Sequence, residues 1–130
     1  MRIMLDSNIL VSAAIFKTKQ MDDFVETIKQ NTIVLTNIIT DEAVGVIKRK
    51  FPHKLKDFTE FLAALSFDGS YIADDGQYDY DIRDSQDRKI LHSAYSCSVD
   101  VLVTGDKDFF AKQYDGLEIL TVTKFLEKYY

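Results

Sequence analysis

Short aliphatic runs rich in β-branched residues alternate along this chain with longer stretches whose apolar residues recur at helical spacing. Runs of this kind predict buried strands, which we expect at residues 3–5, 33–35, 101–103 and 117–120, with a further strand possible at 70–73. The longer stretches predict helices at 9–16, 20–30, from Asn37 or Thr40 to about 50, 55–65 and 87–98, and a short helix at the end. Strands that alternate with helices pair in parallel and are covered on both faces. The pattern therefore predicts an α/β fold with a mostly parallel central sheet.

The composition is that of an ordinary folded domain. The 130 residues include one proline and five glycines, and 46% are hydrophobic, which excludes disordered and low-complexity chains. At roughly 100–200 residues per domain, residues 1–130 are expected to form one domain. The single Cys97 excludes an internal disulfide framework, and no apolar run reaches the roughly 18 residues of a membrane span. We therefore expect a soluble, cytoplasmic protein without membrane association.

The acidic residues are unevenly divided between the two types. The formal net charge is −5, which argues against a surface that coats nucleic acid generally. Sixteen of the 21 acidic residues are Asp and only five are Glu, although Glu is the better helix former. The surplus Asp residues are therefore expected in turns, in helix caps or in a polar site.

Four acidic residues fall where a ligand site is expected in this fold class. Ligands of open α/β sheets bind at the carboxyl ends of the strands. Asp6 directly follows the first predicted strand, and Asp106 follows the strand at 101–103. Glu42 lies just inside the helix after the second strand, and Asp87 lies in the first turn of its helix, two residues after a possible N-cap at Ser85. The four carboxylates are expected to meet at one edge of the sheet.

Such a cluster is unfavourable without a cation. Two like charges about 4 Å apart repel by about 4 kcal/mol at an effective dielectric near 20. Oxygen-rich sites suit Mg²⁺ or Mn²⁺, whereas a zinc site has few ligands available, since the only His residues are His53 and His92 and the only Cys is Cys97. Each acid also has a structural interpretation: Asp6 and Asp106 as helix caps, Asp87 as a partner of the helix dipole, and Glu42 as a surface residue. Only their joint placement favours a divalent-metal site.

The order and spacing of these segments resemble those of the PIN-domain nucleases. The matching segments are Met4-Leu5-Asp6-Ser7-Asn8-Ile9-Leu10, the helix that carries Glu42, Asp84-Ser85-Gln86-Asp87, and Val103-Thr104-Gly105-Asp106-Lys107-Asp108-Phe109. More narrowly, the pattern is similar to that of the VapC-like toxin ribonucleases. Family members often have Pro at the position of Ser85 and an acid at that of Gln86, so either Asp84 or Asp87 is the third site acid; Asp87 is preferred because of its place in the helix.

The resemblance implies a three-layer α/β/α fold and an Mg²⁺- or Mn²⁺-dependent endoribonuclease. It assigns catalysis and metal binding to Asp6, Glu42, Asp87 and Asp106, with Asp108 as a further metal ligand at the rim. It also assigns the orientation of these acids to hydrogen bonds from Asn8 and Thr104. As partners it implies an RNA substrate, a cognate antitoxin protein and a second copy in a homodimer. The alternative is a PIN-like RNA-binding or protein-interaction module with little or no catalysis.

Basic residues near the acids are candidates for phosphate contacts. Lys107 and Arg88 adjoin the predicted site acids, and Lys48, Arg49 and Lys50 begin the densest positive stretch. The competing interpretations are ion pairs with neighbouring Asp residues for the first two and a solvated helix end for the other three. An acidic segment that contains Asp74, Asp75, Asp79, Asp81 and Asp84 is expected to be an exposed loop.

Overall fold

A computed structural model of the protein describes residues 1–73, 76 and 78–130. Its centre is a five-stranded parallel sheet in the order β3-β2-β1-β4-β5. The strands are β1 (Arg2–Leu5), β2 (Thr32–Thr36), β3 (Asp68–Ser70), β4 (Val101–Val103) and β5 (Glu118–Leu120). The inner strands β1 and β4 are buried nearly throughout, which is why they appear in the sequence as continuous apolar runs rather than as an alternation.

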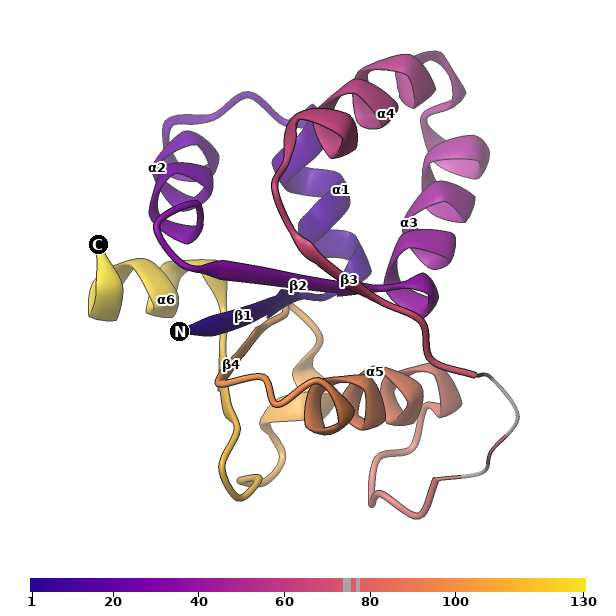
Figure 1. The fold of residues 1–130 in the computed structure, drawn as a ribbon, viewed down its shortest axis with the longest axis vertical. Coiled ribbons are helices and arrows are strands. Elements are labelled where there is room, and N and C mark those ends of the chain that lie inside the picture. Colours follow the sequence, from indigo (N-terminus) through magenta and orange to yellow (C-terminus); the bar gives the residue numbers. More distant parts are fainter. Residues whose placement is uncertain (74–75, 77) are drawn as a thin grey trace.

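Helices cover both faces of the sheet (Figure 1). The helices are α1 (Ser7–Ile15), α2 (Lys19–Ile28), α3 (Asn37–Lys50), α4 (Leu55–Ala64), α5 (Ser85–Ser96) and α6 (Val122–Tyr129), with 3₁₀ turns at Pro52–Lys54 and Lys107–Phe110. Helices α1 to α4 connect β1 to β2 and β2 to β3, and they lie together on one face. Helix α5 precedes β4, which pairs with the other side of β1, and it lies on the opposite face. The predicted three-layer α/β/α fold is confirmed, and the sheet is parallel throughout.

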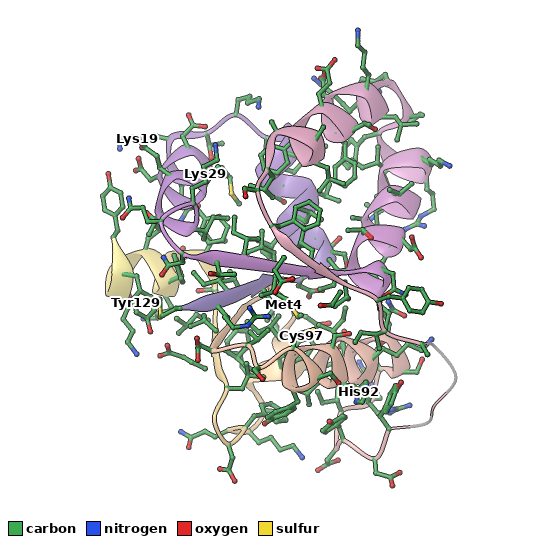
Figure 2. All side chains as sticks on the ribbon, viewed as in Figure 1. Met4, Lys19, Lys29, His92, Cys97 and Tyr129 are labelled. Carbon is green, nitrogen blue, oxygen red and sulfur yellow. The ribbon has the colours of Figure 1, made fainter. Side chains whose placement is uncertain are left out.

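The buried apolar side chains form one connected core between the sheet and its helices. Met4 of β1 lies within this core and is completely buried (Figure 2). Helices α2 and α6 pack edge to face through Phe24 and Phe125, whose ring centroids are 5.4 Å apart. None of the helices in the described residues has the length and apolarity that crossing a membrane requires.

Three local predictions need correction. The strand expected at 70–73 lies at Asp68–Ser70 instead, because its residues pair with β2 although none of them is apolar. Helix α5 has Asp84 rather than Ser85 as its N-cap. Helix α3 begins at Asn37, so Glu42 lies in the second turn rather than just inside the helix. Asp74 and Asp75 of the predicted acidic loop lie outside the described residues.

Candidate active site

The loops after β1 and β4 leave the sheet at its topological switch point. These strands are neighbours, paired at Leu5 and Val103, but the chain that follows β1 enters the helical layer on one face while α5, on the other face, leads into β4. Side chains at the carboxyl ends of such strands border a crevice. Asp6 is the first residue after β1, and Asp106 follows β4 after two residues.

Asp6 is buried and held by hydrogen bonds at both carboxylate oxygens. Its Oδ1 accepts from the backbone N–H of Ser7 at 2.8 Å, as the N-cap of α1, and its Oδ2 accepts from Thr104 Oγ1 at 2.6 Å. Thr104 Oγ1 in turn accepts from the backbone N–H of Asp106 at 3.1 Å. Burial raises the pKa of Asp6, as do the charges of Glu42 and Asp106, and the bonds from Thr104 and Ser7 oppose this shift. The Thr104 hydroxyl therefore ties the loops after β1 and β4 together.

Ser7 connects Asp6 to Glu42, a link that the sequence did not indicate. Its Oγ donates to Glu42 Oε1 at 2.5 Å and lies 3.4 Å from Asp6 Oδ1. Ser7 is completely buried, and α1 packs against α3, so that the first turn of α1 faces the second turn of α3. Glu42 thereby reaches the sheet edge although it lies well inside its helix.

Asp87, Asp106 and Asp108 form a compact carboxylate cluster. Each offers one oxygen, and the three oxygens lie within 4.8 Å of one another. At that separation two ionised carboxylates repel by about 3–4 kcal/mol at an effective dielectric near 20. Burial is the first cause that raises the pKa of Asp87 to about 8, followed by its interaction with Asp106 and by the charges of Asp84 and Asp6. Without a cation, Asp87 therefore holds a proton at neutral pH.

The cluster has the chemistry that a hard divalent cation requires. The buried Oδ2 of Asp87 accepts no hydrogen bond from any residue that the structure describes. An unpaired buried carboxylate oxygen is costly, and two further carboxylate oxygens lie close to this side chain. Mg²⁺ and Mn²⁺ prefer such oxygen ligands, so the residues fit a divalent ion.

The structure separates the roles of Asp84 and Asp87. Asp84 Oδ1 accepts from the backbone N–H groups of Gln86 at 2.8 Å and Asp87 at 3.2 Å, as the N-cap of α5. Asp87, one turn further, places its carboxylate in the cluster. At the rim, Asp108 lies 3.6 Å from the highly exposed guanidinium of Arg83, a residue that the sequence did not single out.

The other predicted site residues lie at varying distances from the cluster. Asn8 is exposed and has no hydrogen bond through its side chain to any described residue, although it borders the same hollow as Asp6 and Asp106. Lys107 is exposed between Asp106 and Asp108. Arg88 directs Nη1 to the backbone oxygens of residues 82 and 83 and so supports the loop before α5.

The basic stretch Lys48, Arg49 and Lys50 is exposed in the last turn of α3. At 1.5 Å rise per residue it lies roughly 9–12 Å along the helix axis from Glu42. Its positive charges also suit the negative end of the helix dipole. The three residues therefore do not adjoin the carboxylate cluster.

Fold and site together define an α/β/α protein with an acidic centre at the switch point of a parallel sheet. A family model described as PIN domain matches residues 2–108. The chain therefore belongs to the PIN domain family, which confirms the resemblance inferred from its motifs.

Solved structures show the same fold in distant relatives. The chain is similar to VapBC2 from Rickettsia felis, solved bound to a DNA fragment from the promoter, with 20% identity, a TM-score of 0.68, and coverage of 92% of this chain and 97% of the other. It is also similar to the PIN domain of RRP44 from T. brucei, with 14% identity, a TM-score of 0.58, and coverage of 97% and 79%. No curated protein matches the sequence.

Proposed function

We propose that this protein is a divalent-metal-dependent endoribonuclease that hydrolyses RNA phosphodiester bonds, and that it is the toxin component of a type II toxin–antitoxin pair. The observation that carries the proposal is the carboxylate cluster of Asp87, Asp106 and Asp108, together with the buried Asp87 Oδ2, which has no hydrogen-bond partner among the described residues. Membership of the PIN domain family supports the nuclease activity. The resemblance of the motifs to those of VapC-like toxin ribonucleases supports the toxin role and the RNA substrate, and the likeness in fold to VapBC2 and to the RRP44 PIN domain agrees with it.

The cluster residues would hold Mg²⁺ or Mn²⁺, with Asp87, Asp106 and Asp108 nearest to one another and Asp6 and Glu42 completing the acidic centre. A divalent ion bound there supplies polarisation of the phosphate and a lowered pKa for a water molecule. Thr104 and Ser7 fix the carboxylates of Asp6 and Glu42. Binding of the ion requires Asp87 to lose its proton, because a carboxylate binds metal in its ionised form.

Substrate and protein partners are part of the proposal. Exposed Lys107 lies in sequence between two cluster acids and is the best placed of the predicted phosphate contacts. We assign a cognate antitoxin as partner on the strength of the VapBC2 likeness, and a homodimer and a cytoplasmic location from the resemblance to VapC-like toxins. An inhibitor of this kind would have to cover the cluster to keep RNA away from it.

The test is cleavage of structured and single-stranded RNA with Mn²⁺, with Mg²⁺ and with chelator, by wild type and by Asp106→Asn. Asparagine retains an oxygen for the backbone N–H of Asp108, which Asp106 accepts at 2.9 Å, so the variant is expected to fold. Asp115→Asn, at an exposed acid outside the cluster, is the matched control. We expect metal-dependent cleavage by wild type and by the control, and at least 100-fold less by Asp106→Asn.

Calorimetric titration with Mn²⁺ distinguishes the alternative of a binding module without catalysis. A nuclease site binds the ion and is stabilised by it, and Asp106→Asn weakens both effects. RNA binding without Mn²⁺ binding or cleavage would instead identify the binding module. Cleavage that persists in Asp106→Asn would place the activity elsewhere and refute the proposed site.

A further inference from the structure

Two hollows adjoin the acidic centre. One, of about 310 Å³, is bordered by Asp6 and Asp106. The other, of about 510 Å³, lies beside Glu42 and is lined by Asn37, Ile38, Asp41, Glu42, Tyr71 and Gln86. Its volume lies within the range of small-molecule sites. A chain substrate held at the carboxylates would therefore find space for a neighbouring group on the Glu42 side.

Hydrogen bonds hold the backbone on both sides of Tyr71, whereas the residue itself is largely exposed. On one side Ser70 pairs with Thr36 in the sheet. On the other side the Asn37 amide binds the backbone of Ile72 twice, accepting from its N–H at 2.7 Å and donating to its carbonyl at 3.0 Å. Residue Tyr71 is nevertheless 80% exposed, the highest value among the large hydrophobic residues that the structure describes. The backbone bonds on both sides of Tyr71 thus keep an exposed aromatic side chain at the wall of the hollow.

The polar groups of this hollow suit a nucleobase better than a phosphate. Its described lining contains two carboxylates, from Asp41 and Glu42, and no Lys or Arg. Two carboxylates repel a phosphate, whereas they accept hydrogen bonds from the N–H groups of a base edge. Aromatic side chains bind the faces of unstacked bases in single-stranded nucleic acid. Gln86, beside Asp87 in sequence, adds an amide that offers both donors and acceptors.

We propose that this hollow is a nucleobase subsite, in which a base of single-stranded RNA next to the cleaved phosphate stacks on Tyr71 while its amino edge donates to Asp41. The inference rests on the proposed nuclease function and specifies its substrate. Guanine fits best, because its N1–H and N2–H₂ groups present parallel donors to one carboxylate. Uracil fits worst, because two carbonyl oxygens flank its single N–H donor and would face the carboxylate.

The first experiment measures kcat/KM on short single-stranded RNA for Tyr71→Ala, Tyr71→Phe and Tyr130→Ala. Tyr130 is the matched control, since it is 74% exposed at the chain end and does not line the hollow. Loss of a stacking ring is expected to lower kcat/KM about 5- to 100-fold, mainly through KM. Phenylalanine retains the face, so Tyr71→Phe and Tyr130→Ala are expected to stay within about twofold of wild type. Equal activity of Tyr71→Ala and wild type would overturn the subsite.

The second experiment removes the base instead of the ring. After the cleaved bond is mapped, an abasic nucleotide is placed at each flanking position in turn. At one of these positions, the abasic nucleotide is expected to lower the kcat/KM of wild type by about the same factor as Tyr71→Ala does. The same abasic RNA is expected to lower the kcat/KM of Tyr71→Ala little further, because the two changes remove the same contact. Additive losses would show that ring and base do not meet. Replacing that base by uracil should lower the kcat/KM of wild type about tenfold. Asp41→Asn should largely abolish this discrimination against uracil.

Binding measurements separate failure of the subsite from failure of the nuclease proposal. Fluorescence anisotropy of a labelled RNA is measured in the Asp106→Asn background, where turnover is removed. A weaker affinity after Tyr71→Ala supports the subsite whether or not the wild-type protein cleaves RNA. Unchanged affinity overturns it.

Discussion

Replacing Asp87 by Asn is expected to stabilise the metal-free protein, although Asp87 is buried. The pKa of this carboxyl rises from 3.8 to about 8 in the fold, first because of burial and then because of Asp106. At about 1.4 kcal/mol per pH unit this rise corresponds to at most about 6 kcal/mol of unfavourable ionisation. Asp106 and Asp108 share the charge of the cluster, so only part of this penalty belongs to Asp87. We therefore expect Asp87→Asn to raise the free energy of unfolding by about 2–4 kcal/mol at pH 8.

The pH dependence gives the sign of this effect. Below about pH 4 the carboxyl is protonated in both the folded and the unfolded chain, so it carries no penalty. Between pH 4 and 8 only the unfolded chain releases the proton. The folded state then binds more protons, and the free energy of unfolding falls as pH rises. The advantage of Asp87→Asn is therefore expected to be about 1 kcal/mol at pH 5 and to reach its full value near pH 8.

Urea unfolding in chelator at pH 5 and pH 8, followed by circular dichroism, measures this difference. Asp115→Asn is the control, and its free energy of unfolding is expected to match that of wild type within about 0.5 kcal/mol at both pH values. With Mn²⁺ the order is expected to reverse, because only an intact Asp87 gives the full stabilisation by bound ion. A variant that is less stable than wild type at pH 8 in chelator, or a gap that does not change with pH, would refute the reasoning.

Three further substitutions test the groups around the cluster. Thr104→Val removes the donor to Asp6 Oδ2 and should lower the free energy of unfolding in urea by about 1–3 kcal/mol and abolish most of the activity, whereas Thr104→Ser should retain both. Ser7→Ala should leave the free energy of unfolding within about 1 kcal/mol of wild type, because the backbone N–H that donates to the Asp6 cap of α1 remains. It should weaken Mn²⁺ binding about 10- to 100-fold, because the Glu42 carboxylate loses its hydrogen bond from Ser7. An unchanged Mn²⁺ affinity in calorimetry would contradict this. Lys107→Ala should reduce the magnitude of the slope of log affinity for RNA against log salt concentration by about 1. Replacing one of the lysines in the last turn of α3 by Ala should change this slope far less.

The inner part of the fold was predictable because its strands are buried on both faces. A strand such as β1 or β4 is apolar along nearly its whole length, so its position is visible in the sequence. The edge strand β3 consists of Asp, Gly and Ser, and its largely exposed residues carry no such signal. Its place is fixed by pairing with β2, which is a tertiary contact and therefore not visible locally.

The site was predictable only as far as backbone topology determines it. A strand end fixes the residue that follows it, which is why Asp6 and Asp106 could be placed at one sheet edge. The bond from Ser7 to Glu42, and the clamp of Asn37 on the backbone of Ile72, join residues 35 positions apart. Such contacts depend on how α1 and β3 pack beside α3, and no residue pattern within either partner segment encodes them.

Helix capping and site formation, which the sequence presents as competing explanations of the same acids, are compatible in this structure. A carboxylate has two oxygens, and a cap occupies one of them: Asp6 Oδ1 caps α1, and Asp106 Oδ1 accepts the backbone N–H of Asp108. That bond fixes the orientation of the whole carboxylate, because its two oxygens are rigidly joined. Asp6 Oδ2 is thereby directed to Thr104, and Asp106 takes its place in the cluster. The use of Asp at these two positions follows from the same geometry: the shorter side chain can cap its own helix and present its second oxygen at the sheet edge. Glu42, which has no such cap, relies on Ser7 instead.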